Sequence, residues 1–253
     1  MNRDSNLLNN EFNMVYDDWM VDGSFEIKKT YAAKDMLKSV GMKYPDVGDE
    51  EVDKKFEYLY EKTLTAHQKL VLMLFAEYNF HKVKAEFEST QNMEFPALYG
   101  MGNTMFLFYI ESMILFARNA LDVAATVYSD LIFSKRSDSF NDFSKWVIKS
   151  NNLLLENLKQ YFKDNGEDGV SAFRLLCGQE KGRALRDIII HQANVRLEYY
   201  EYKENSEKEH LFLLLKDMEP IDIDCFVSNF VDEVEDIFYI TTLCCEKYLL
   251  NEI

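Results

Sequence analysis

One short stretch of the 253-residue chain combines residue types that can move a proton and bind a phosphate. It runs from Arg183 to Asn194, and its centre is Arg186-Asp187-Ile-Ile-Ile-His191. A histidine suits proton transfer near neutral pH, and an arginine suits a two-pronged contact with a phosphate group. A reaction at a phosphate group without a metal ion needs a base for the attacking hydroxyl, an acid for the leaving oxygen and a cation for the charged intermediate. Arg186 and His191 are therefore the first candidate site residues.

The acidic residue inside this stretch, Asp187, adds a third group. It lies four residues from both Arg183 and His191, so on one helix its carboxylate can hold the arginine and orient the imidazole. The alternative is a structural ladder in which these three side chains only stabilise the helix. The candidates for catalysis are Arg186, Asp187 and His191, and the candidates for substrate binding are Arg183, Gln192 and Asn194.

Helical geometry limits how Arg186 and His191 can work together. A step of five residues along a regular helix separates two side chains by about 140°. The two residues therefore do not share one face of a regular helix. We expect a working site either where the helix frays near His191 or where residues of two copies of the chain combine across a two-fold axis.

This motif resembles the hallmark of the HEPN superfamily, which is an arginine, a polar residue and a histidine in an R-x4-6-H pattern. The resemblance covers about residues 100 to 253, and the helix around Phe116 to Asp122 is similar to the first long helix of such bundles. It implies an α-helical dimer in which two motifs meet. Many members are metal-independent endoribonucleases of toxin–antitoxin and phage-defence systems, and others are not catalytic. The toxin subset often has a tyrosine at the position of Ala193.

The resemblance also sets the expected partners, which are a second copy of the chain, RNA, and an antitoxin or regulatory protein. No cofactor and no metal ion are expected. The formal net charge of −16 argues against nucleic-acid binding by overall charge, so any RNA site must act locally against that field. The four cysteines form no CxxC pair, which fits a reducing cytosol. No signal peptide is recognisable, and the most apolar run, Met105 to Ala117, contains Glu111. We therefore expect a cytoplasmic protein with no membrane partner.

Three other patterns are weaker candidates. Gly100-Met-Gly102 lacks the lysine and the preceding strand of a phosphate-binding loop, so we expect a simple helix start. Glu77 and His81 have helical spacing for a shared metal ion but form no HExxH motif. The ExxH pattern from Glu207 to His210 has no second copy, as di-iron bundles would require. We expect all three patterns to be structural.

Helical periodicity dominates the first half of the chain. From Asp49 to about Gln91, apolar residues recur at intervals of three and four residues and form one apolar stripe, which includes Phe75. A second long helix is expected from Asn103 or Thr104 to about Phe133, after a break at Pro96 and the two glycines. Its expected buried face consists of Leu107, Ile110, Ile114, Ala117, Leu121, Ala124, Ala125, Tyr128 and Ile132.

The second half mixes helices with one hairpin. The pattern predicts a helix over residues 140–162, a loop over 164–169 and a helical turn over 171–176. The segment from Val195 to Tyr202 has a period of two residues, which is typical of a β-strand. A polar turn and a return strand from His210 to Lys216 follow it. Asp222 or Asp224 is expected to cap a final helix that ends near Leu250.

These elements predict an all-α fold, an antiparallel helical bundle with a small β-hairpin inserted before the last helix. We expect residues 1–97 to form an N-terminal helical extension and residues 98–253 to form the HEPN-like bundle, with the hairpin near 195–216. Two alternatives to a ribonuclease remain open. One is a catalytically inert HEPN-like scaffold for protein or nucleotide binding, and the other is a helical adaptor unrelated to HEPN.

Overall fold

The residues that the structure describes form seven α-helices. The computed structural model describes residues 31–90, 96–167, 171–177, 196–201, 209–214 and 220–252. Apart from one short 3₁₀ turn, the other regular elements in these ranges are three short strands. The predicted fold class is confirmed: the chain is all-α with a small antiparallel hairpin before its last helix.

The described residues belong to two compact units. The first contains residues 31–68, 119–163 and 235–252. The second contains residues 69–90, 96–118, 164–167, 171–177, 196–201, 209–214 and 220–234. Three long helices have residues in both units: α3 (Glu50–Thr90), α4 (Pro96–Phe133) and α9 (Ile223–Glu252). The domain boundary expected near residue 97 stays a prediction.

Helix α3 (Glu50–Thr90) matches the range predicted from its periodicity. Asp49 caps it, because its carboxylate accepts a 2.8 Å hydrogen bond from the Glu51 backbone N–H. The acidic residues of the first turn suit the positive end of the helix dipole. One residue of the predicted apolar stripe, Phe75, is 44% exposed. The buried face of α3 is therefore narrower than the spacing of its apolar residues predicted.

Helix α4 (Pro96–Phe133) begins seven residues before the predicted start at Asn103. Proline is well placed at a first helical position, where no intrahelical N–H bond is required. Gly100 and Gly102 lie inside the helix, so the predicted break at these residues is wrong and no loop exists there to bind a phosphate. A glycine costs a helix only about 1 kcal/mol relative to alanine, which a long helix can absorb. The predicted buried face is otherwise confirmed, and only Leu107 of that set is partly exposed.

One segment of α4, Thr104–Phe133, is long and apolar enough to cross a membrane, judged by length and composition over the described residues. Within its most apolar window, 44% is buried inside the protein. The core helix of a soluble protein has the same features. The cytoplasmic location therefore stays a prediction.

The helix predicted over residues 140–162 is two helices, α5 (Phe140–Lys149) and α6 (Glu156–Glu167). Ser150 leaves the helix with an extended backbone, and a 3₁₀ turn, η1 (Leu153–Leu155), follows. The Asn152 side chain accepts a 2.9 Å hydrogen bond from the Leu154 backbone N–H. Serine and asparagine favour such local bonds over a continuing helix, which explains the break. At the other end, α6 runs four residues into the predicted loop, to Glu167.

Aromatic side chains fill the core of the first unit. Phe140 and Phe143 of α5 contact Phe162 of α6, with ring centroids 5.7 and 6.3 Å apart respectively. Tyr128 of α4 packs 5.7 Å from the Phe143 ring. Its hydroxyl lies 2.9 Å from that of Thr242 on α9 (Ile223–Glu252), which ties the last helix to this core. Helix α2 (Tyr31–Lys43) belongs to the same unit and buries Met36 and Val40.

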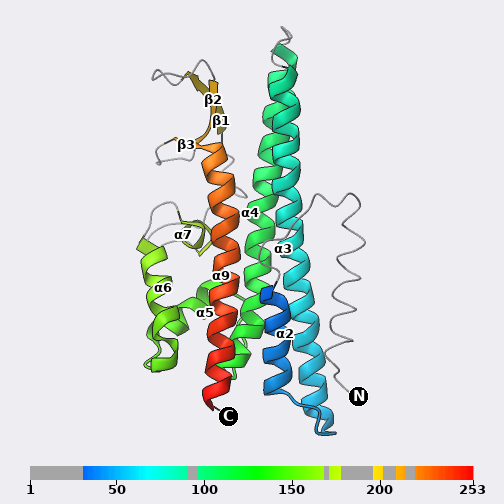
Figure 1. The fold of residues 1–253 in the computed structure, drawn as a ribbon, viewed down its shortest axis with the longest axis vertical. Coiled ribbons are helices and arrows are strands. Elements are labelled where there is room, and N and C mark those ends of the chain that lie inside the picture. The colour runs from blue at the N-terminus through cyan, green and yellow to red at the C-terminus, as the bar shows by residue number, and fades with distance from the viewer. Residues whose placement is uncertain are drawn as a thin grey trace. The chain divides into compact units, whose positions relative to one another are not determined.

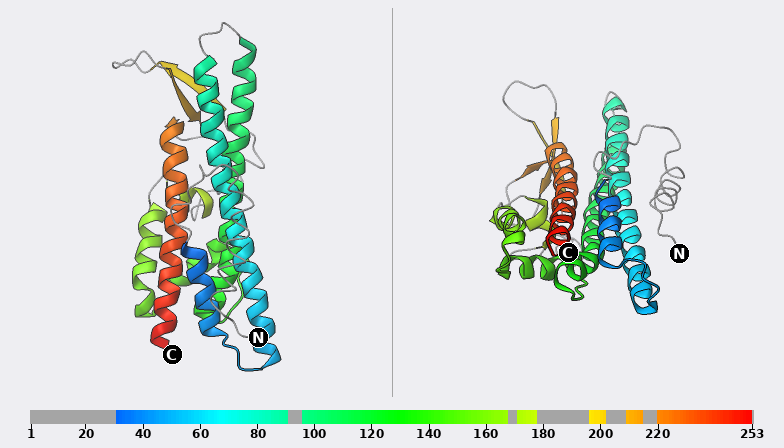
Figure 2. Two further views of the ribbon diagram at one scale, coloured as in Figure 1. Left: turned by 45° about the vertical axis from the view of Figure 1, so that its right-hand side comes forward. Right: turned by 60° about the horizontal axis from the view of Figure 1, so that its bottom comes forward.

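The second unit combines parts of α3, α4 and α9 with α7 (Ala172–Cys177) and a three-stranded sheet. Within it, α3 and α4 run side by side, with the Phe80 and Phe106 ring centroids 5.6 Å apart (Figure 1, Figure 2). Strands β1 (Arg196–Glu201) and β2 (Glu209–Leu214) form the predicted hairpin. Strand β3 (Ile221–Asp222), which was not predicted, pairs with β2 and leads directly into α9 (Figure 1).

Candidate functional site

The predicted site residues all lie outside the described part of the chain. They are Arg183, Arg186, Asp187, His191, Gln192 and Asn194. The described elements on either side are α7, which ends at Cys177, and β1, which begins at Arg196. The candidate segment therefore follows α7 and precedes β1 in the chain, and both of these elements belong to the second unit.

The N-terminal end of α7 is held by two side chains. Ser171 caps it, because its hydroxyl accepts a 3.2 Å hydrogen bond from the Arg174 backbone N–H. The same hydroxyl donates to the main-chain oxygen of Asn165. Glu233 of α9 accepts a hydrogen bond from the Ala172 backbone N–H. A carboxylate at this end also complements the helix dipole, so the start of α7 is fixed to α9 by charge as well as by hydrogen bonding.

The C-terminal end of α7 is held by Arg118 of α4. Its Nη1 atom donates a 2.8 Å hydrogen bond to the main-chain oxygen of Leu176 and lies 3.6 Å from the Cys177 sulfur. The Arg118 residue is only 8% exposed. A buried guanidinium needs hydrogen-bond acceptors to offset its lost hydration, and the last carbonyl groups of a helix have no acceptor role inside the helix. Arg118 therefore fixes the point at which the chain leaves α7.

The sheet holds the part of the chain that follows the motif in sequence. Arg196 pairs with Leu214 at the start of the hairpin, and Leu197, Leu211 and Leu213 are buried. Asp222 at the end of β3 caps α9, accepting hydrogen bonds of 3.0 and 3.1 Å from the backbone N–H groups of residues 224 and 225. This confirms the predicted cap at Asp222. The chain thus passes from the motif into a sheet that is anchored at the start of the last helix.

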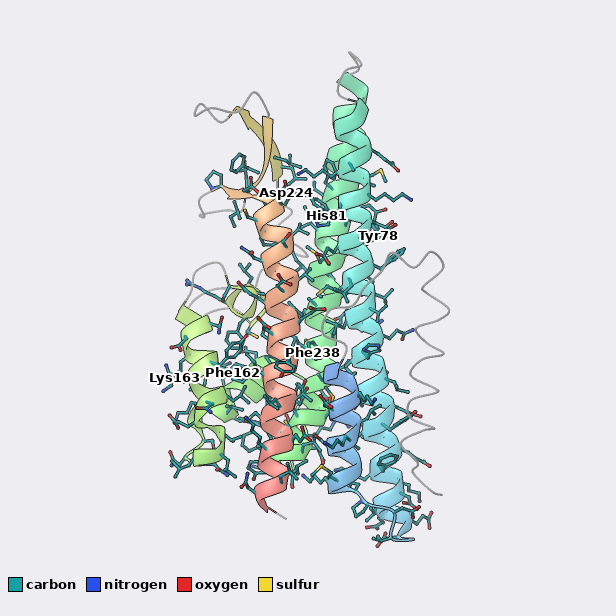
Figure 3. All side chains as sticks on the ribbon, in the orientation of Figure 1. Tyr78, His81, Phe162, Lys163, Asp224 and Phe238 are labelled. Atoms are coloured by element: carbon teal, nitrogen blue, oxygen red, sulfur yellow. The ribbon has the colours of Figure 1, made fainter. Side chains whose placement is uncertain are left out.

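A second group of polar side chains in this unit joins α3 to the start of α9. Lys84 forms an ion pair with Asp224, and the His81 Nε2 atom lies 4.0 Å from a Glu77 carboxylate oxygen. Figure 3 shows His81 on α3 and Asp224 at the start of α9. Partial burial lowers the pKa of His81, Asp224 opposes that shift, and Lys84 adds to it. The imidazole is therefore mostly neutral at neutral pH. Among the described residues, no three histidine, cysteine or acidic side chains gather in a way that could hold a metal ion.

No protein-family model, curated protein or solved structure matches the chain.

Buried charge also occurs in the first unit, around Asp130 near the end of α4. Its carboxylate lies 2.7 Å from the Lys55 ammonium and accepts a hydrogen bond from the Tyr44 hydroxyl. Lys43 donates to the main-chain oxygens of Asp130 and Leu131, the latter at 3.2 Å. Burial lowers the pKa of Lys43, and burial followed by the bond to Asp130 raises the pKa of Tyr44. Lysines at the end of a helix satisfy its free carbonyl groups, so this cluster stabilises the C-terminal end of α4.

Sequence reasoning missed Arg118 and Glu233 as parts of the site framework. Arg118 had one usable signal, which is a charged residue beside the apolar positions Ile114 and Ala117 of the predicted core helix. Glu233 had none, because acidic residues are frequent along the last helix. Both act on partners far away in the sequence; Arg118 and Leu176 are 58 residues apart.

Proposed function

We propose that the chain is a HEPN-like, metal-independent endoribonuclease of the toxin–antitoxin or phage-defence type that acts as a homodimer in the cytoplasm. The observation that carries the proposal is the position of the Arg186–His191 motif in the chain. It lies between α7, which is fixed at both ends, and a hairpin that is anchored to the last helix. This framework supports the proposal because a catalytic histidine and arginine work only when their backbone is held in place.

The proposed chemistry gives each group a part in the reaction. His191 takes the proton of the ribose 2′-hydroxyl as that oxygen attacks the neighbouring phosphorus, and the imidazolium that forms then delivers the proton to the leaving 5′-oxygen. Arg186 neutralises the charge that develops on the phosphate oxygens. Asp187 orients the imidazole, while Arg183, Gln192 and Asn194 bind ribose and phosphate. Attack by the 2′-oxygen breaks the bond to the 5′-oxygen, so the products carry a 2′,3′-cyclic phosphate and a free 5′-hydroxyl.

The second candidate is an inert HEPN-like scaffold that binds a protein or a nucleotide. The formal net charge of −16 favours it, because such a field slows the approach of RNA. In that case Arg183, Asp187 and His191 stabilise a helix. A cognate antitoxin or regulatory protein would bind either form.

The test of the function is incubation of the purified full-length chain with a panel of structured and unstructured RNAs in EDTA at low ionic strength. Cleavage with 2′,3′-cyclic phosphate ends is expected, and an RNA that is 2′-O-methylated throughout should remain intact. No cleavage of any RNA by well-folded protein would favour the scaffold. Cleavage of the methylated RNA would exclude the proposed attack by the 2′-hydroxyl.

The dimer is tested by mixing two inactive variants, Arg186→Ala and His191→Ala. If one site combines Arg186 of one copy with His191 of the other, mixed dimers contain one intact site and recover roughly a quarter of the wild-type rate, since half of the dimers are mixed. Each variant alone stays inactive. An inactive mixture, in which subunit exchange is demonstrated by mass, would contradict a shared site.

A further inference from the structure

Arg118 combines strong burial with direct contacts to the main chain. It lies on α4, the most apolar of the described helices, and only 8% of the residue is exposed. A lysine or arginine at such a position needs hydrogen-bond partners, and a guanidinium offers five N–H groups in a fixed plane. Its Nη1 atom reaches the Leu176 oxygen at 2.8 Å and the Cys177 sulfur at 3.6 Å. The buried charge is thus directed at the last residues of α7.

These contacts hold α7 at both ends. Ser171 and Glu233 hold its first residues, and Arg118 holds its last two. A six-residue helix has too few internal hydrogen bonds to be stable alone, so such contacts and its buried apolar residues are needed to keep it in position. Removing Arg118 therefore frees the C-terminal end of α7 while leaving its N-terminal end attached.

The distance along the chain connects this attachment to the motif. Arg183 follows Cys177 by six residues. Even a fully extended chain spans at most about 3.6 Å per residue, so the first arginine of the motif lies within roughly 22 Å of the point that Arg118 fixes. The first arginine of the motif is therefore only six residues along the chain from the end of α7 that Arg118 holds.

We propose that Arg118 is a positioning residue for the Arg186–His191 motif, acting through Leu176 and Cys177 at the end of α7. It does not contact RNA. Its role is to hold the start of the motif segment so that His191 and the scissile phosphate keep a reactive geometry. This inference rests on the proposed function, but the contact to α7 can be tested without it.

Cys177 reports directly on that contact, because its thiol is buried and lies beside Arg118. The experiment measures alkylation of Cys177 by N-ethylmaleimide, with peptide mass spectrometry to separate it from the other three cysteines. Arg118→Met is compared with wild type and with Arg118→Lys, which keeps a charged donor. The matched control is Arg136→Met, which removes an arginine whose side chain is 66% exposed. Helical circular dichroism shows that each variant is folded.

Local opening of α7 in Arg118→Met should raise the alkylation rate of Cys177 by about tenfold or more, while Arg118→Lys and Arg136→Met stay near wild type. Unchanged alkylation in folded Arg118→Met would overturn the inference. If Arg118→Met does not fold, Arg118→Gln takes its place, and the same two outcomes apply.

RNA cleavage gives the second readout. A lost positioning contact should lower kcat by about tenfold and leave KM nearly unchanged, with recovery in Arg118→Lys. Faster alkylation with an unchanged kcat would overturn the positioning role. Faster alkylation in a chain whose wild type cleaves no RNA would instead uphold the attachment of α7 and overturn the proposed function.

Discussion

Helix α4 carries two buried charged residues, Arg118 and Asp130, and their surroundings differ in kind. Asp130, in the first unit, is enclosed by Lys43, Tyr44 and Lys55, so its charge is matched by charged and hydroxyl groups from one short region of chain. Arg118, in the second unit, donates to a main-chain oxygen and a thiol at the end of a six-residue helix. Burial of a charge therefore does not by itself mark a functional site. What matters is which segment the buried charge holds in place.

The first prediction tests the cluster around Asp130. Asp130→Ala removes the carboxylate that lies 3.7 Å from the Lys43 ammonium, whose side chain is only 18% exposed. Removing one partner of a buried ion pair costs about 3 kcal/mol or more of unfolding free energy. Urea denaturation of the purified chain measures the loss. Asp138→Ala is the control, because that side chain is 68% exposed, and its effect should be below about 0.5 kcal/mol. Equal losses in the two variants would remove the contrast between the Asp130 cluster and the surface.

The second prediction compares how two histidines contribute to the pH dependence of the unfolding free energy. His67 lies in the first unit and His81 in the second. Burial lowers the pKa of His67 from 6.5 to about 4. Between these two values the unfolded chain binds a proton that the folded chain does not, so stability falls as the pH falls through this window. Because of His67, the unfolding free energy is about 3 kcal/mol higher above pH 6.5 than below pH 4.

Urea denaturation at pH 7.5 and pH 4.5 should therefore show a smaller pH dependence in His67→Gln than in wild type. His81→Gln is the comparison in the second unit. Its side chain is 45% exposed, so its removal should change the pH dependence less. A larger change in His81→Gln than in His67→Gln would contradict the assignment of the more deeply buried histidine to the first unit.

The third prediction concerns the cap of α7. Ser171→Ala removes the hydroxyl that accepts from the Arg174 N–H and donates to the Asn165 oxygen, and should cost about 1 kcal/mol of unfolding free energy. Ser228→Ala, at an exposed position of α9, should be nearly neutral. Thermal unfolding followed by circular dichroism compares the two. No difference between them would mean that the α7 framework is weaker than its hydrogen bonds indicate.

Much of the fold could be predicted because periodicity and capping act locally. The ranges of α3 and α9 and the cap at Asp222 follow from neighbouring residues, as does the hairpin. The errors arose where local signals competed. Gly100 and Gly102 suggested a break inside α4, while Ser150 and Asn152 were weak signals for the break that does occur after α5.

The candidate site was less predictable. The R-x4-H motif could be found from residue types and spacing, but the framework around it depends on contacts between distant parts of the chain. Arg118 and Leu176 meet across 58 residues, and Glu233 and Ala172 meet across 61. Such pairs leave no periodic trace in one sequence. Lys43, Tyr44 and Asp130 likewise meet only in the folded chain.

The role of the Arg186–His191 motif is tested by the rate of RNA cleavage in EDTA per folded molecule, measured for wild type, His191→Ala and Asp130→Asn. We expect His191→Ala to lose about 100-fold or more in rate with an unchanged unfolding free energy. Asp130→Asn should lose stability and keep the wild-type rate per folded molecule. Cleavage by His191→Ala at the wild-type rate would contradict the assignment of the activity to the motif.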